Sequence, residues 1–341
     1  MPKSKRKRAA RAFACERPVP MVELPPNSGR PSASTPPPGP RAPCGPDLVP
    51  PILYTARSVQ IVHNKPMIPP LPPMRLSSLL AALFKRGSAD SAPASLQTDF
   101  LLPRIDGAHV ARYNALLGFA AGTVPLTYYY LLTQRAHLAT MLAKGFPFRV
   151  AGMVHVENSL TETQPADRAR PLHLATTVTI LPVAANGAVE CELVTLAMQE
   201  GTVVFTCVSK YLAKRGKKKG IGKAATRDTI EGKRIGGWAV GGSLGRAYAK
   251  VSGDWNPIHL WRWSARLMGM RRPIIHGMHS VAAACALLEQ TSARRVTAIS
   301  ARFKAPIVLR TRPTLYVSGD HHKYCIGLDG RRVVDGTVSL A

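Results

Sequence analysis

Three side chains that can handle a proton or a water molecule lie within six positions in the stretch YAKVSGDWNPIHLWRW, residues 248–263. Asp254 and His259 flank the pair Asn256–Pro257. Proline restricts its own φ and keeps the preceding residue out of the helical region, so the turn can direct both flanking side chains into one cavity. A carboxylate that orients an imidazole is a common way to hold and deprotonate a water molecule. The spacing therefore predicts a water-activating turn, although an Asx-type turn without chemistry uses the same residue types.

A glycine that could bind negative charge follows 18 residues after His259. Gly277 stands at the expected start of an apolar helix, where free N–H groups and the helix dipole favour an anion. Because glycine has no side chain, a carbonyl oxygen can approach its N–H closely. A water activator and an oxyanion site are together what the addition of water beside a thioester carbonyl requires. His276 and His279 could share a metal on one helix face, but no third ligand accompanies them, so capping or packing without a metal is predicted.

The elements expected to position these residues form an α+β pattern. A helix-length apolar segment at 111–145 precedes three β-rich segments, and tight turns separate these segments, so an antiparallel sheet is predicted at 173–183, 188–199 and 202–213. In the second half, a short helix around Tyr248 and a helix at 277–290 precede four more expected strands, at 295–303, 313–318, 323–327 and 332–340. A long helix followed by antiparallel strands thus occurs twice, which predicts two copies of one α+β unit.

The first part of the chain has a different composition. Residues 1–74 hold 19 of the 30 prolines and begin with MPKSKRKRAAR. Such a segment buries too little apolar surface to offset its ordering entropy, so residues 1–96 are expected to be a disordered, basic, Pro-rich tail. The segment could also be a nuclear or nucleic-acid-binding patch, an organellar transit peptide, or the product of an over-long gene start before Met67 or Met74. Within it, residues 76–86 are a candidate for a short amphipathic helix.

Charge and cysteine content narrow the class of protein. The 341 residues include 46 Lys and Arg against 19 Asp and Glu, a net charge of +27, which favours an anionic partner. Six scattered cysteines without a CxxC pair argue against a zinc cluster or a disulfide framework and suit a reducing compartment. Residues 113–134 carry no charge, but polar residues and a proline interrupt them, so no membrane span is predicted.

The stretch YAKVSGDWNPIH, the 18-residue gap and RPIIHGMHS closely resemble the MaoC-like (R)-specific enoyl-thioester hydratase/dehydratase family, which has the hotdog fold. ARFKAPIVLRTRPTLYV, residues 301–317, is similar to the strand and loop that follow in that family. More weakly, residues 146–158 and ARPLHL resemble the degenerate partner domain of its two-domain members. The resemblance covers about residues 97–341 and implies two tandem hotdog folds, each an antiparallel sheet wrapped around a long central helix.

The resemblance also implies a division of the chain. Residues 97–213 would form a degenerate, non-catalytic hotdog domain, residues 214–234 a basic linker, and residues 235–341 the catalytic domain. The first half lacks an Asp-x-Asn-Pro-x-His motif and would widen the channel for a long acyl chain. Two hotdog units in one chain can pair internally, so either a monomeric pseudo-dimer or a homodimer is expected.

By the same resemblance, Asp254 and His259 would bind the reacting water, and the Gly277 N–H would polarise the thioester carbonyl. Four further residues would bind substrate or shape the loop: Asn256, Pro257, His276 and Ser280. The family commonly has a serine in the central helix near position 285, where this chain has a cysteine. The resemblance therefore does not specify the contact that this helix position makes.

The expected activity is reversible hydration of trans-2-enoyl thioesters to (R)-3-hydroxyacyl thioesters. CoA or an acyl-carrier protein would carry the substrate, and no metal or redox cofactor is expected. The expected location is the cytoplasm, or an organellar matrix if the tail is a transit peptide. Two alternatives remain: thioester hydrolysis on the same fold, and nucleic-acid binding. Residues 1–74 contribute a net 8 of the 27 positive charges, and the rest lacks the aromatic interleaving of RNA-binding platforms, so no nucleic-acid partner is expected.

Overall fold

The computed structural model describes residues 67–87, 95–214 and 229–341, all of which belong to one compact unit, residues 64–341. Its first half contains α1 (Leu76–Phe84), β1 (Ser95–Leu102), α2 (Gly107–Leu117), η1 (Leu126–Tyr128), α3 (Tyr129–Leu142), β2 (Val154–Glu162), β3 (Leu172–Ile180), β4 (Val189–Gln199) and β5 (Thr202–Lys214). The second half contains β6 (Lys233–Gly237), α4 (Leu244–Ser252), η2 (Pro257–His259), α5 (Arg262–Leu267), α6 (Gly277–Ser292), β7 (Val296–Phe303), β8 (Thr314–Val317), β9 (Lys323–Leu328) and β10 (Arg331–Leu340).

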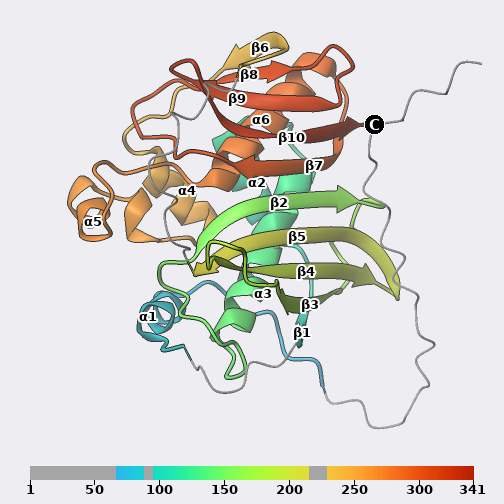
Figure 1. Ribbon diagram of the computed structural model, residues 1–341. Coiled ribbons are helices and arrows are strands. Elements are labelled where there is room, and N and C mark those ends of the chain that lie inside the picture. The colour runs from blue at the N-terminus through green and yellow to red at the C-terminus, as the bar shows by residue number, and fades with distance from the viewer. Residues whose placement is uncertain (1–66, 88–94, 215–228) are drawn as a thin grey trace, which may run out of the picture. The chain divides into compact units, whose positions relative to one another are not determined.

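All ten strands form one antiparallel sheet in the order β1-β3-β4-β5-β2-β7-β10-β9-β8-β6. Read outward from the centre, the two halves have the same topology: β2, β5, β4, β3, β1 on one side and β7, β10, β9, β8, β6 on the other. Figure 1 shows this ladder, with α3 behind the first five strands and α6 behind the second five. The predicted repeat of one α+β unit, with the double-hotdog fold, is therefore correct.

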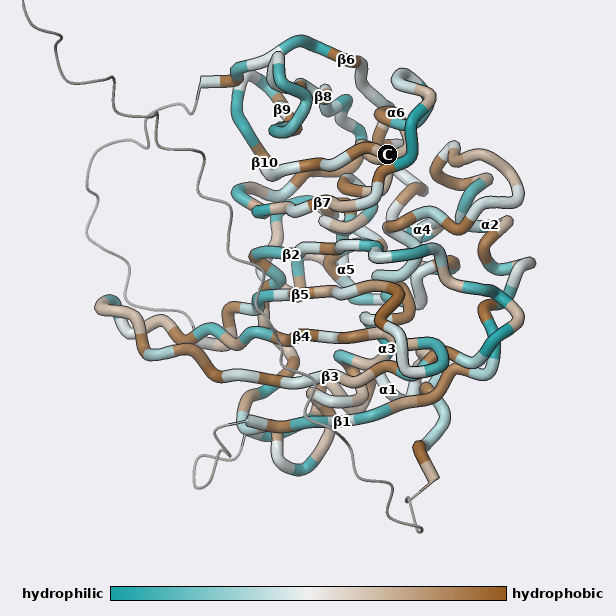
Figure 2. The backbone as a smooth tube through the Cα atoms, turned by 90° about the vertical axis from the view of Figure 1, so that its right-hand side faces the viewer, coloured by the Kyte–Doolittle hydropathy of each residue, from teal (hydrophilic) through white to brown (hydrophobic). Residues whose placement is uncertain are grey.

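The two central helices are buried almost all round because each sits in the curve of its own half-sheet (Figure 2). The run TYYYLL, residues 127–132, lies in this interior with every residue buried. Helix α6 likewise buries most of its length, including Cys285. Within the described residues, the four cysteines are buried and free: Cys191, Cys207, Cys285 and Cys325. No helix among these residues is long and apolar enough to cross a membrane.

The halves join where β2 pairs with β7, with Leu160 opposite Ile299. A partly buried ion pair reinforces this junction, since the guanidinium of Arg295 donates to both carboxylate oxygens of Glu162, at 2.6 and 3.0 Å. The Glu162 side chain is 3% exposed, and the Tyr129 hydroxyl also donates to it at 2.9 Å. A charge-assisted, forked pair of this kind holds the junction in one register.

Several elements differ from the sequence-based expectation. Strands β1, β2 and β6 were not predicted as strands, and β6 begins at Lys233, inside the expected linker. The expected tail is structured wherever it is described. Helix α1 confirms the predicted helix at 76–86. The N–H of Leu71 donates to the Leu101 carbonyl at 2.8 Å, and the N–H of Leu101 donates to the Pro69 carbonyl at 2.9 Å. Leu71 is also buried, because it packs on the core of the first half. The basic run at 215–223 and residues 1–66 lie outside the described residues.

Candidate active site

The turn that carries the Asp-x-Asn-Pro-x-His motif joins α4 to η2. Helix α4 ends at Gly253, which has a φ of +76° as its left-handed cap. Asp254 then accepts the N–H of Asn256 through its carboxylate at 3.1 Å, and the Asn256 side chain accepts the N–H of Ile258 at 3.3 Å. Pro257 begins η2, where its missing N–H costs nothing. These two consecutive side-chain turns shape the loop and direct Asp254 and His259 to the same side.

A second glycine sets how closely this turn approaches α4. A Cβ atom at Gly245 would overlap the carbonyl oxygen of His259, so only glycine allows the helix to pack there. The guanidinium of Arg246 donates to the next carbonyl, that of Leu260, at 3.0 Å. Sequence reasoning did not single out Gly245, because the close approach joins residues 14 positions apart and leaves no local signature.

His259 is held in one tautomer. The N–H of Ile274 donates to the Ile258 carbonyl at 3.1 Å, which brings the segment before α6 beside the turn. The Nδ1 of His259 lies 2.9 Å from the Ile274 carbonyl oxygen, and because a carbonyl only accepts, Nδ1 carries the proton. Nε2 is then an unprotonated acceptor. Desolvation of the ring, which is only 7% exposed, lowers the pKa of His259 despite the nearby Asp254 charge, so the imidazole is a neutral base.

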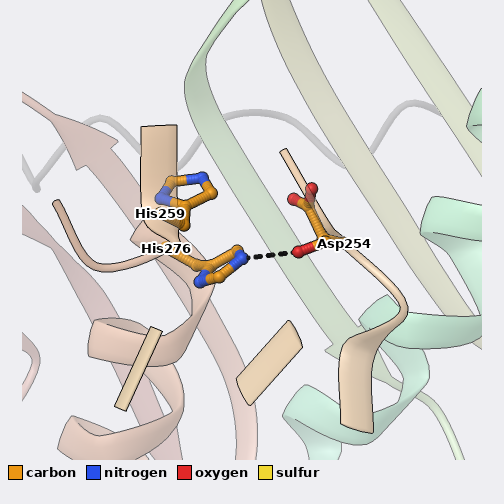
Figure 3. Close-up of side chains that lie close together, drawn as sticks. All are labelled: Asp254, His259 and His276. Carbon is orange, nitrogen blue, oxygen red and sulfur yellow. Dashed lines mark hydrogen bonds between the residues drawn. The ribbon is translucent and has the colours of Figure 1, made fainter. Parts of the chain in front are cut away.

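His276 connects the two ends of the turn. Its Nε2–H donates to the main-chain carbonyl of Asp254 at 2.9 Å, and its ring stacks on that of His259, with centroids 3.7 Å apart and planes at 27° (Figure 3). Desolvation, and next the proximity of His259, holds the pKa of His276 well below its usual range. A neutral His276 therefore acts as a clamp between Asp254 and His259.

Asp254, His259 and His276 bring one carboxylate oxygen and two ring nitrogens within 4.8 Å of one another. His276 thus lies in one cluster with Asp254 and His259, a contact that the sequence had not indicated. Such a donor set can hold a metal in principle. Here the two imidazoles lie face to face, so a single ion could not lie in the plane of both rings. The spacing suits a water molecule better, because one water can bridge two polar atoms at this separation.

Gly277 begins α6 next to this cluster. As a first-turn residue its N–H has no acceptor within the helix, and the residue is exposed while its neighbours His276 and Met278 are buried. A Cβ at this position would lie 2.7 Å from the ring of Phe303, on β7. Glycine is therefore required for the packing as well as for access to the N–H.

The first turns of α6 carry further buried polar atoms. Within the described residues, Tyr248 Oη, His276 Nδ1, His279 Nδ1 and Ser280 Oγ are buried without a hydrogen-bond partner. The ring of Tyr248 contacts those of His276 and His279, with centroids 4.9 and 5.3 Å apart. Desolvation lowers the pKa of His279 to about 4, so it is neutral. This face of the site has the capacity to receive polar groups of a ligand. Tyr248 was missed as a site residue, although it opens the motif.

The first half contributes one wall of the same region. His155, on β2, has a hydrogen-bond partner only at Nδ1, the Tyr130 hydroxyl at 3.4 Å, and Nε2 has none in the described part of the chain. Its ring stacks on Tyr211 and contacts Phe303, with centroids 4.7 and 5.2 Å apart. Desolvation lowers its pKa to about 4. His155 therefore connects the first half of the chain to Phe303, the residue that packs against Gly277.

The chain is similar to known proteins in both sequence and structure. Residues 244–339 match the family described as "MaoC like domain". The chain is 30% identical over 256 residues to 3-hydroxyacyl-thioester dehydratase X of Mycobacterium tuberculosis, an alignment that covers 68% of this chain and 86% of that protein. The crystal structure of HtdX from the same organism superposes with a TM-score of 0.58 at 26% identity, over 72% of this chain and 100% of that one.

A MaoC-like dehydratase from Phytophthora capsici has the same fold, with a TM-score of 0.54 at 17% identity over 74% of this chain and 98% of that one. The family match falls on the half that carries the Asp254 turn, and the longer alignment extends over both halves. The chain belongs to the MaoC-like dehydratase family.

Proposed function

We propose that this protein catalyses the reversible hydration of trans-2-enoyl thioesters to (R)-3-hydroxyacyl thioesters. The observation that carries the proposal is the fixed tautomer of His259, whose Nδ1–H bond to the Ile274 carbonyl leaves a basic Nε2 beside the Asp254 carboxylate. The neighbouring α6 start supplies a free N–H at Gly277. The similarity to a protein named 3-hydroxyacyl-thioester dehydratase X supports the same reaction class.

In the hydration direction, Asp254 and His259 hold one water between them. The Gly277 N–H polarises the thioester carbonyl, which draws electron density from the conjugated double bond. The water oxygen then bonds to Cβ while its proton passes to Nε2 of His259, and the pair returns a proton to Cα. One H and one OH are thus added, and dehydration is the reverse. Because His259 is neutral, it can accept the proton at the start of each cycle.

We also propose that only the second half is catalytic and that the two halves form an internal pseudo-dimer. Asp254, His259 and Gly277 all lie in that half, and the β2–β7 pair already joins the two sheets within one chain. The domain limits proposed for the non-catalytic and catalytic halves remain 97–213 and 235–341.

The test uses purified protein and crotonyl-CoA or a longer enoyl-CoA. Hydration decreases the enoyl absorbance without release of free thiol, and chiral analysis identifies an (R)-3-hydroxyacyl product. Asp254→Asn and His259→Gln should each lower kcat by about a hundredfold or more. His321→Ala is the matched control, because this histidine is exposed in a turn. Release of free thiol would instead show a thioesterase, and wild-type turnover in both site variants would disprove the roles assigned here.

A further inference from the structure

A basic groove lies between the two halves, beside the catalytic turn. It has a volume of about 710 Å³ and runs between α2 of the first half and α4 of the second. Its lining includes three cations and two indoles: Arg112, Arg246, Lys250, Trp255 and Trp261. None of the described residues that line it is acidic. The groove therefore combines positive charge with aromatic surface, and the water-activating cluster uses none of these five side chains.

Helical spacing explains why the cations face one another. Arg246 and Lys250 are four residues apart on α4, and Arg112 precedes Leu116 by four on α2, so each pair lies along one face of its helix. Leu116 and the α4 residue Val251 supply apolar surface between the charges. An elongated ligand with an uncharged body and an anionic end matches this pattern.

The three cations are not equivalent. Arg246 is fixed, since it donates to the Leu260 carbonyl and its guanidinium lies 5.8 Å from the centre of the Trp261 ring. Lys250 and Arg112 are exposed, and neither belongs to an ion pair among the described residues. The pKa of the Asp106 carboxyl is lowered mainly by main-chain hydrogen bonds, and the nearby charge of Arg112 contributes least. Arg112 and Lys250 therefore remain available to an anion that enters from solvent.

Trp255 connects the groove to the turn that carries Asp254. Its side chain lines the groove, and the next residue before it in the chain, Asp254, carries the carboxylate of the catalytic cluster. A ligand in the groove would therefore lie next to this turn and among the cations of α2 and α4.

We propose that this groove binds the phosphate-bearing arm by which the thioester is carried, with Arg112 and Lys250 as the phosphate ligands. The inference rests on the proposed function, because the arm is that of the enoyl thioester. CoA and a carrier protein present the same chemistry here, an uncharged amide-containing chain that ends in a phosphate ester. Arg246 and Trp261 form the wall against which the arm lies. Both halves of the chain thus bind substrate, although only one carries the reacting groups.

The test compares three enoyl thioesters of one acyl length: the CoA ester, the carrier-protein ester and the pantetheine ester, which has no phosphate. In the double variant Arg112→Gln/Lys250→Gln, KM for the CoA and carrier esters should rise about tenfold or more with kcat little changed, because charge-assisted contacts to the handle are lost before the chemical step. KM for the pantetheine ester should change less than twofold. Arg331→Gln is the control, since it removes one exposed positive charge on β10, away from the groove.

The outcomes separate the two proposals. If the wild-type protein hydrates the pantetheine ester but the double variant has the same KM as the wild type for all three esters, the groove assignment is wrong and the proposed reaction stands. An increase confined to the CoA ester also overturns it, because the shared phosphate would then not be the group recognised. If the wild-type protein hydrates none of the three, the proposed function itself fails.

Discussion

Replacing Gly277 by alanine tests whether the amide at the start of α6 takes part in the reaction. The added Cβ would lie 2.7, 3.0 and 3.1 Å from three atoms of the Phe303 ring. Carbon atoms in contact prefer about 3.5–4.0 Å, so the ring or the helix start must move by about 1 Å. Overpacking of this kind costs about 1–3 kcal/mol of stability. A displacement of about 1 Å at a reacting centre lowers the rate by about a hundredfold.

The assay measures kcat and KM for an enoyl-CoA together with the free energy of unfolding in urea. We expect Gly277→Ala to lower kcat by about a hundredfold while most of the protein remains folded at 25 °C. The double variant Gly277→Ala/Phe303→Leu removes the obstructing ring edge and should recover at least tenfold of the lost kcat, with Phe303→Leu alone as reference. Gly241→Ala is the matched control, because a Cβ there meets nothing within 4 Å and its φ is not positive.

Wild-type turnover by Gly277→Ala would refute the reasoning, since the amide could then be displaced without consequence. A loss that Phe303→Leu fails to recover, in a variant with unchanged unfolding free energy, would show that the clash with Phe303 is not its cause.

Three other predictions concern stability and cofactor use. Burial lowers the pKa of His155 and His279 to about 4, so both stay neutral in the native state, while the unfolded chain binds protons below about pH 6.5. Urea titrations should therefore show the free energy of unfolding decreasing by about 1.4 kcal/mol per pH unit for each histidine as the pH is lowered from about 6.5 to 4. A flat profile in this range would contradict these assignments. A chain that starts at Met74 lacks the main-chain carbonyls of residues 71–72, which accept from Arg135 at 2.8 and 2.9 Å. Its free energy of unfolding should be lower by about 3 kcal/mol or more than that of a chain that starts at Met67. Equal stability of the two chains would show that this segment does not contribute. Chelators should leave turnover unchanged, because the stacked imidazoles cannot both point at one ion; loss of turnover that a divalent metal restores would refute this.

Much of the secondary structure and the turn at Asp254 could be predicted because the relevant interactions are local. Strands β3, β4 and β5 follow alternating patterns closed by short turns, and α6 starts at the predicted Gly277. The two side-chain turns that shape the Asp254 loop join residues only two positions apart. Residue type and spacing are sufficient to specify contacts of this range.

Strands β1, β2 and β6 were not predicted, because they are identified by the strands that they pair with rather than by their own composition. Central strand β2 owes its place to β7, which pairs Glu157 with Arg302 across 145 residues of chain. The edge strand β6 has only five residues and two glycines, so it has no periodic pattern to detect. The segment before β1 was expected to be disordered because its composition offers too little apolar surface to bury, but Leu71 is buried and its N–H donates to the Leu101 carbonyl.

Sequence alone indicated which groups are available for chemistry: the residues that could bind a water molecule and the glycine whose N–H could be accessible. It also indicated that one α+β unit is repeated. The tertiary structure decided how these groups act together. It stacked His276 on His259, aligned Nδ1 of His259 with a carbonyl 15 residues away, and placed Phe303 against Gly277. It also placed the α2 and α4 cations in one groove. Such contacts depend on burial and on close approach between distant segments, and these arise only when the two halves pack into a single sheet and core.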